Sequence, residues 1–271
     1  PARRAGTGRS RTATARQPIY ENTMKLTDTH SHLYDTAFDA DREEALARAA
    51  AAGVEHLLLP GIDSESHGAL FDLCRRHPGQ CVPMMGLHPT SVNDNPHWRE
   101  ELALAERYLT APPEGIARFC AVGEIGLDYH YEGYDRDVQI RLFREQLDLA
   151  KQLDLPVIIH ARDCTEDYVN ILREMRPRGV VHCFSGSAET AREVLKLGMY
   201  IGFTGVLTFK NAKKALKALA EVPEDKLVLE TDCPYMAPVP FRGKRCDSRM
   251  IPYTAEAAAL VRGTDTQTIL E

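Results

Sequence analysis

The sequence predicts an α/β fold, a closed (β/α)8 barrel of parallel strands. Eight short apolar runs recur along the chain, and amphipathic stretches separate them. Parallel strands need crossover connections of this kind, and eight such repeats over ~250 residues match one barrel. An open doubly wound sheet is the alternative, but the chain has no GxGxxG or GxxxxGK[ST] motif to support it. We therefore expect the barrel.

The expected strands are short runs rich in Val, Ile and Leu, bounded by turn-forming or charged residues. In chain order they span residues 25–32, 54–61, 81–89, 119–128, 155–162, 179–186, 199–205 and 226–234. The intervening stretches repeat apolar residues at helical spacing, most clearly over residues 41–52, 136–153, 188–197 and 212–221. These stretches supply the crossover helices that parallel strands require.

The composition is that of a globular protein. The chain has 271 residues, of which 44% are hydrophobic and 27% charged, enough for the core of one large domain. No apolar run approaches the ~20 residues of a membrane span. The seven cysteines form no CxxC pair and sit mostly in apolar segments, which favours reduced thiols and a cytoplasmic location.

Residues 1–23 differ from the rest of the chain. They hold five arginines, one acidic residue and almost no apolar residues, so we expect a disordered Arg-rich extension. A transit peptide is one explanation, but Met24 followed by Lys25 and Leu26 favours translation from an upstream start. We expect the barrel domain to span residues 24–271. Without the extension's +4, the net charge of −6 becomes about −10, so binding to nucleic acid would need a local basic patch or bound cations.

Two histidines end the first expected strand. His30 and His32 are two residues apart, so on a strand their side chains share a face. Neutral imidazole is the commonest metal ligand. Alone, an HxH pair is more often a surface pair or a satisfied core pair, so the interpretation depends on the other strand ends.

Polar residues that can bind metal close four later strands, and the C-terminal ends of barrel strands surround one mouth. A lone histidine after an apolar run is more often a hydrogen-bonded core residue. An unpaired carboxylate at the rim of a core is costly without a cation, however. Six such residues near the C-terminal ends of the strands are better explained by a metal site than by coincidence. They are His30, His32, Glu124, His160, His182 and Asp232.

Four imidazoles and two carboxylates suit Zn, Mn, Fe or Mg. Six protein ligands exceed one tetrahedral ion, so we expect two divalent ions ~3.5 to 4 Å apart that share a carboxylate. We assign Glu124 as this bridge. Such a pair activates water and stabilises charge on phosphoryl or carbonyl oxygens, which predicts hydrolysis. We also assign Asp232 as the group that takes the proton from the attacking water.

Five motifs, in order along the chain, resemble those of a known family. They are Thr27-Asp28-Thr29-His30-Ser31-His32, Gly86-Leu87-His88-Pro89, Val122-Gly123-Glu124-Ile125-Gly126-Leu127-Asp128-Tyr129, His182-Cys183-Phe184-Ser185-Gly186 and Glu230-Thr231-Asp232-Cys233-Pro234-Tyr235. From about residue 25 onward the chain resembles TatD-type metal-dependent deoxyribonucleases. The resemblance implies a TIM barrel of the metal-dependent hydrolase superfamily, two divalent metal ions (Mg, Mn or Zn) and a 3'-5' exonuclease acting on DNA. Carried over motif by motif, the ligands are the same six residues.

The chain departs from the family pattern in two places. After Arg242-Gly243-Lys244-Arg245, many members continue Asn-Glu-Pro, whereas this chain has Cys246-Asp247-Ser248. We expect that loop to line the substrate mouth, which puts substrate contacts in question and not the metal ligands. Relatives usually carry a further helix beyond Glu271, so we expect a truncated C-terminus.

The expected substrate contacts are His88, Arg162, Lys210 and Arg242. Lys210 begins a run of lysines at helical spacing with Lys213, Lys214 and Lys217, although such a basic face is more often simply solvated. Arg162, two residues after His160, is either a phosphate clamp or a partner of Asp163 or Glu166. His88 either reaches the scissile group or only shapes a turn before Pro89. Tyr129 and His130 either stack on a base or pack at the rim.

Three classes of function follow from this site. The first is a dinuclear metal deoxyribonuclease acting on ends or single strands, because an acidic domain has little reason to hold long duplex. The second is an ester or amide hydrolase of the same fold, such as a D-aminoacyl-tRNA deacylase. The third is a non-catalytic metal-binding barrel, which six convergent ligands argue against. Activity on an oligonucleotide and on an aminoacyl ester separates the first two.

Overall fold

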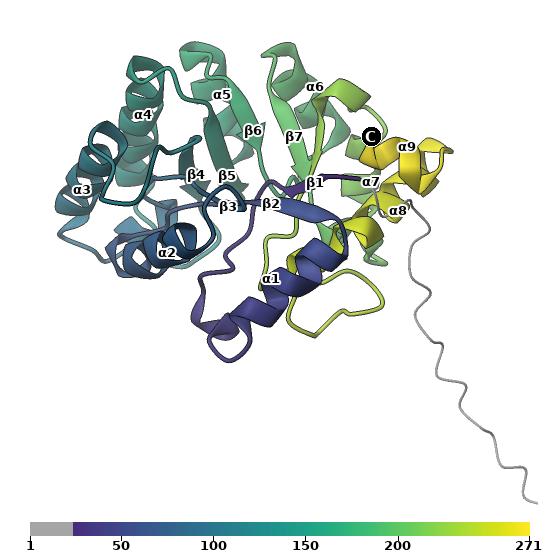
Figure 1. Ribbon diagram of the computed structural model, residues 1–271. Coiled ribbons are helices and arrows are strands. Elements are labelled where there is room, and N and C mark those ends of the chain that lie inside the picture. The colour runs from purple at the N-terminus through teal and green to yellow at the C-terminus, as the bar shows by residue number, and fades with distance from the viewer. Residues whose placement is uncertain (1–23) are drawn as a thin grey trace, which may run out of the picture.

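The computed structural model describes residues 24–271, which form the predicted barrel (Figure 1). Its eight strands fall within the eight expected runs, so the predicted α/β barrel is confirmed. The expected extension, residues 1–23, lies outside the described residues. The strands are β1 (Leu26–Asp28), β2 (Val54–Leu59), β3 (Cys81–Pro83), β4 (Val122–Asp128), β5 (Val157–Arg162), β6 (Gly179–Val181), β7 (Tyr200–Phe203) and β8 (Leu227–Leu229).

All paired strands run parallel, and their pairing closes the barrel. β1, β2 and β3 form one hydrogen-bonded sheet, and β4 to β8 form a second in chain order. Two single bridges join the sheets: Met85 pairs with Val122, and Ser31 pairs with Cys233. The second bridge joins the segment after β1 to the loop after β8. The C-terminal ends of the strands therefore surround one mouth.

The helices lie around the strands (Figure 1), and several begin at side-chain caps. Asp63, Asp135 and Ser187 each accept a hydrogen bond from a backbone N–H in the first turn of the helix that follows. The helices are α1 (Arg42–Ala51), α2 (Ser64–Arg76), α3 (Trp98–Thr110), α4 (Arg136–Gln152), α5 (Thr165–Met175), α6 (Ala188–Lys196), α7 (Lys213–Leu219), α8 (Ile251–Arg262) and α9 (Thr266–Leu270). Among these, none is long and apolar enough to cross a membrane.

Branched apolar side chains of the strands make up much of the core. Leu57 and Leu59 of β2, Val157 and Ile159 of β5 and Ile201 of β7 are fully buried. Truncating one such Leu or Ile to Ala typically costs ~2–5 kcal/mol. This packing holds the strands in register and so determines where the residues after each strand lie.

Six of the eight strands end earlier than expected, while β4 and β5 end at the expected residues, and the earlier ends place some candidate ligands in loops. β6 ends at Val181 and β8 at Leu229, so His182 and Asp232 follow their strands. The expectation that Glu124 ends its strand is wrong, because β4 continues to Asp128 along β5. Glu124 therefore enters the site from within the wall of the barrel.

Two expectations about loops after the later strands are also wrong. The helix α7 begins only at Lys213, so Lys210 lies in the turn between the short helix Gly205–Thr208 and α7 and is not part of a four-lysine helical face. Cys246, Asp247 and Ser248 are at most 3% exposed, and Asp247 pairs with Arg48 of α1. These residues pack against the barrel rather than lining its mouth.

Candidate metal centre

The backbone around β1 and β8 brings the first histidine pair next to Asp232. The Asp232 N–H donates to the carbonyl of His30 at 2.9 Å, and the His32 N–H donates to the carbonyl of Cys233 at 2.8 Å. Buried Asp28, at the end of β1, accepts hydrogen bonds from the N–H and hydroxyl of Thr231. These bonds join the first and last strands and hold the three candidate ligands at one place.

Glu124 lies where the pairing of β4 with β5 is irregular, between Val122 and Ile125. Irregularities of this kind re-aim side chains near functional sites. The Glu124 N–H donates to the carbonyl of Gly61, beyond the end of β2, at 3.0 Å. The Glu124 side chain is buried among histidines from both sheets.

His160 of β5 is positioned by a close approach between strands. A Cβ atom at Gly126, which has φ +144°, would lie 2.0 Å from the carbonyl oxygen of His160, so this position needs glycine. The His160 Nε2 lies 2.8 Å from Asp128 Oδ2, and its Nδ1 lies 2.9 Å from Glu124 Oε1. Asp128 thus holds the ring while Nδ1 faces Glu124.

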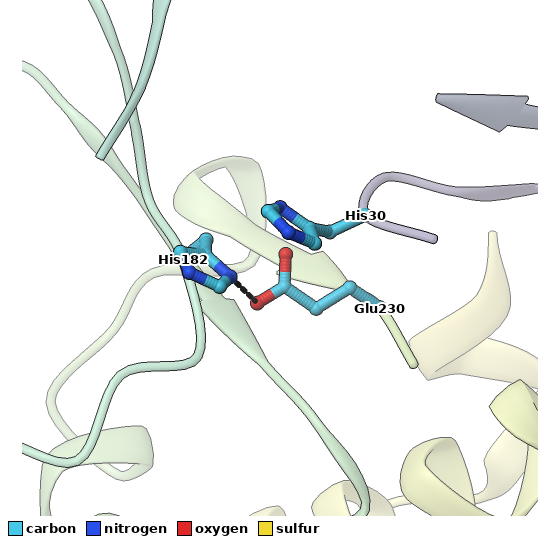
Figure 2. Close-up of side chains that lie close together, drawn as sticks. All are labelled: His30, His182 and Glu230. Carbon is cyan, nitrogen blue, oxygen red and sulfur yellow. Dashed lines mark ion pairs between the residues drawn. The ribbon is translucent and has the colours of Figure 1, made fainter. Parts of the chain in front are cut away.

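His182 follows β6 and stacks on His30, with ring centroids 3.9 Å apart. Its Nδ1 lies 3.7 Å from Glu230 Oε1, the pair drawn in Figure 2. Glu230 also accepts hydrogen bonds from the Cys183 N–H and the Thr29 hydroxyl. Both carboxylate oxygens of Glu230 therefore face donors, and His182 turns its Nε2 toward Glu124.

The two oxygens of Glu124 face two separate groups of side chains. Oε2 lies 3.2 Å from His30 Nε2 and 3.7 Å from His32 Nε2. Asp232 Oδ1 completes this group, 3.8 Å and 3.4 Å from the same two nitrogens. The nitrogens of the two histidines are themselves 3.1 Å apart.

The other oxygen of Glu124 faces the later histidines. Oε1 lies 2.7 Å from His182 Nε2 and 2.9 Å from His160 Nδ1. Those two nitrogens are 3.5 Å apart, and His88 Nε2 lies 3.5 Å from the same oxygen. The six sequence-predicted ligands therefore lie together, with Glu124 between the two groups.

Both groups fit a divalent cation. Ligand atoms about 2.1 Å from one ion lie about 3.0 to 3.4 Å apart in octahedral or tetrahedral geometry, and most separations here are close to that range. Hydrogen bonds also fix ring protons. Tyr34 donates its hydroxyl proton to the carbonyl of Pro60, so its oxygen accepts from His32 Nδ1 at 2.9 Å. The Nε2 lone pair of His32 is then free for an ion.

The pKa values show that the buried carboxylates of the candidate centre are stabilised by positive charge. Burial raises the pKa of Glu124, but His182, His30 and His88 outweigh it and hold that pKa well below its usual range. Burial lowers the pKa of His182, yet the Glu124 carboxylate overrides it and raises that pKa to about 9. Burial lowers the pKa of His30 to about 4. Without an ion, protons on histidine supply the charge, and a divalent cation would displace them.

The expected substrate contacts are spread around this cluster. His88 accepts a hydrogen bond from the Thr90 N–H at Nδ1, so its proton is on Nε2, which faces Glu124. The Arg162 guanidinium lies 5.5 Å from the centre of the Tyr131 ring, and its charge lowers the pKa of Asp128. The Arg242 guanidinium stacks 4.0 Å from the centre of the Phe209 ring, next to exposed Lys210. Among the described residues, Lys210 and Arg242 have no ion-pair partner.

Sequence reasoning missed three acidic residues that organise the centre. Asp128 holds His160, Glu230 lies beside His182 and accepts from the N–H of Cys183, and Asp28 joins β1 to the Thr231 turn. Burial raises the pKa of Glu230 to about 7 and that of Asp28 to about 6. A signal existed: Asp128 and Glu230 each stand an even number of residues from a candidate ligand, and on an extended segment this places them on the same face.

The barrel, its buried histidine and carboxylate clusters and the relatives below define a metal-dependent hydrolase. Residues 27–271 match the family described as TatD related DNase, and the chain belongs to this family. The chain is 40% identical over 241 residues to an uncharacterized metal-dependent hydrolase, YabD of Bacillus subtilis, covering 86% of this chain and 90% of that protein.

Two further relatives extend the comparison. The 3'-5' ssDNA/RNA exonuclease TatD of Erwinia tasmaniensis is 33% identical over 242 residues, covering 86% of this chain and 91% of that protein. The crystal structure of YjjV, a TatD homologue from Escherichia coli K12, has a TM-score of 0.82 at 32% identity, covering 91% of this chain and 93% of that one. The resemblance drawn from the five motifs is confirmed at the level of the family.

Proposed function

We propose that this chain is a 3'-5' exonuclease that hydrolyses phosphodiester bonds of single-stranded DNA with two divalent ions. The observation that carries the proposal is Glu124, whose two oxygens face two separate groups of candidate ligands. One relative is named as a 3'-5' ssDNA/RNA exonuclease, which supports the substrate class.

The proposed ligands divide between the two oxygens of Glu124. His30, His32 and Asp232 would hold one ion, and His160 and His182 the other, with Glu124 shared. When bound, Mg, Mn or Zn ions in this arrangement lower the pKa of water and neutralise charge on phosphoryl oxygens. Because four of the ligands are imidazoles, purified protein can contain Zn even if Mg is the ion that supports turnover.

Asp232 is the proposed proton acceptor. Burial raises its pKa, but the hydrogen bond from His32 and then the neighbouring histidines outweigh burial and lower it, so the carboxylate is ionised at neutral pH. Its side chain is 13% exposed, more than those of His30, His32 and Glu124. It can therefore reach the water side of the cluster and accept a proton from an attacking water.

His88 is the proposed donor on the substrate side. Its proton is on Nε2, because the Thr90 N–H occupies Nδ1. Burial lowers the pKa of His88, so the ring is neutral and keeps this single proton at pH 7. That N–H points to the Glu124 side of the centre, where it can donate to a phosphoryl or leaving oxygen.

Three basic residues are the proposed phosphate contacts. Arg162 ends β5 at the mouth, and Lys210 and Arg242 lie on neighbouring loops after β7 and β8. Unpaired cations next to the centre provide the local attraction that an acidic domain otherwise lacks. The seven cysteines, all within residues 24–271, are free thiols, which supports a cytoplasmic location.

The test is hydrolysis of a 5'-labelled single-stranded DNA oligonucleotide with Mg, Mn or EDTA. We expect metal-dependent shortening from the 3' end, and a loss of turnover in Asp232→Asn. The matched control is Asp225→Asn, an exposed carboxylate before the start of β8, which should keep full activity. If metal-loaded protein leaves DNA and RNA intact but cleaves an aminoacyl-tRNA ester, the proposal is wrong and the deacylase alternative holds.

A further inference from the structure

Exposed aromatic and apolar side chains gather on two loops at the mouth of the barrel. Of the seven large hydrophobic residues exposed within residues 24–271, five lie in the loops after β4 and β8. These five are Tyr131, Tyr134, Tyr235, Met236 and Val239. Both loops begin near the candidate centre, because the first follows Asp128, which holds His160, and the second contains Asp232.

The exposed ring of Tyr131 contacts the Arg162 guanidinium. Its side chain is 51% exposed, and the Arg162 guanidinium lies 5.5 Å from the ring centre, with Nη1 3.5 Å from the hydroxyl. His130 packs edge-on against it at 5.4 Å and is itself paired with Asp163. The ring thus contacts Arg162 and His130 within the protein, and about half of its surface stays exposed.

Tyr235 lies on the opposite loop, next to the candidate centre. It is 57% exposed, and its N–H donates to the carbonyl of Asp232 at 2.9 Å. Its exposed ring therefore lies three residues after the candidate ligand Asp232, on the loop that follows β8.

The other tyrosines of the β4 loop have structural partners. Tyr129 stacks on Tyr134 at 4.7 Å, and its hydroxyl donates to Asp167 at 2.7 Å. Of the two outcomes open for Tyr129 from sequence, rim packing is the one observed. The exposed rings that remain near the centre are Tyr131 and Tyr235.

We propose that Tyr131, supported by Arg162, and Tyr235 form a stacking platform for unpaired bases of the nucleic acid strand whose phosphodiester bond lies at the metal centre. This inference rests on the proposed function. Aromatic rings stack on any base, and arginine adds attraction to ring and phosphate alike. In a duplex the base faces are already stacked, so a platform of this kind favours a frayed or single-stranded end.

The experiment compares binding of two 5'-fluorescein-labelled octadeoxynucleotides by anisotropy, in Ca²⁺ in place of Mg²⁺ so that turnover is slow. One is complete, and the other carries abasic sites at its last two 3' positions. We expect the wild-type protein to bind the abasic strand about 5- to 100-fold more weakly. Tyr131→Leu and Tyr235→Leu should weaken binding of the complete strand while changing affinity for the abasic strand less than twofold.

Two controls locate the effect. Tyr131→Phe keeps an aromatic ring and should retain wild-type affinity. Tyr200→Leu alters a tyrosine that is 39% exposed and has Lys226 4.4 Å from its ring centre, but it starts β7 at the other end of the barrel and should have no effect. All three substituted tyrosines are exposed, so the far-UV circular dichroism of the four variants should match that of the wild type.

The outcomes separate this inference from the proposed function. If the protein cleaves DNA but binds complete and abasic strands equally, the stacking platform is refuted and the exonuclease stands. If Tyr200→Leu and Tyr131→Leu lower the affinity for the complete strand equally, the proposed location of the stacking platform is refuted. If the protein neither binds nor cleaves DNA, both proposals fail.

Discussion

The hydrogen bond between Asp128 and His160 gives a graded prediction for one of the two proposed ions. Asp128 is 1% exposed, and its Oδ2 lies 2.8 Å from His160 Nε2. Burial raises the pKa of Asp128, but the hydrogen bond from His160 outweighs burial and lowers it. The acceptor of this hydrogen bond is therefore an ionised carboxylate. The carboxylate fixes the ring so that Nδ1 faces Glu124.

Two substitutions at Asp128 should weaken the ion at His160 by different amounts. Asp128→Asn keeps an oxygen acceptor but loses its charge, which is worth about 1 kcal/mol, or about fivefold in affinity. Asp128→Ala removes the bond and should cost about 10- to 100-fold, the usual range for a residue that orients a metal ligand. The ion at His30 should change less than twofold in both variants.

The assay is calorimetric titration of metal-free protein with Mn²⁺, resolved into two sites. Asp163→Asn is a matched control, since Asp163 makes a 2.9 Å contact with His130 Nδ1 at the surface and faces no candidate ligand. Unchanged affinity in Asp128→Ala, or equal weakening of both ions, would refute the proposed role of Asp128.

Further predictions concern the ligands, the proton acceptor and the basic loop. His160→Ala should remove one ion and leave the ion at the first-strand histidine pair, as measured by elemental analysis; equal loss of both would contradict the division of ligands. Asp232→Asn should lower kcat far more than it changes KM in steady-state kinetics. Lys210→Ala should raise KM for DNA and flatten its salt dependence, whereas Lys151→Ala, at the far end of α4, should not. Because the raised pKa of His182, about 9, means that a proton must leave before an ion binds, metal affinity should rise with pH by up to tenfold per unit from pH 7 to 9.

The convergence of the six candidate ligands could be predicted because a parallel barrel brings its strand ends to one mouth. His30, His160 and Asp232 are far apart in sequence, but the strand order alone places them together. The motifs also identified the family. Both predictions depend on the hydrophobic periodicity, the strand order and the motifs, all of which can be read from the sequence.

The finer organisation depends on atoms whose positions the sequence does not determine. The irregular pairing at Glu124 aims its oxygens at different groups, and it follows from contacts with Gly61 and β5. The roles of Asp128 and Glu230 depend on which nitrogen of His160 or His182 each one faces. Helical spacing does not predict the position of Lys210, because a turn separates this residue from the start of α7.

The central claim is that two ions share Glu124, and metal content tests it most directly. The measurement is elemental analysis of protein dialysed against Mn²⁺ or Zn²⁺, for the wild type and Glu124→Gln. The account predicts two ions per chain in the wild type and weakened binding of both in Glu124→Gln, because one carboxylate serves both groups. One ion per chain in the wild type, or loss of a single ion in Glu124→Gln, would contradict it.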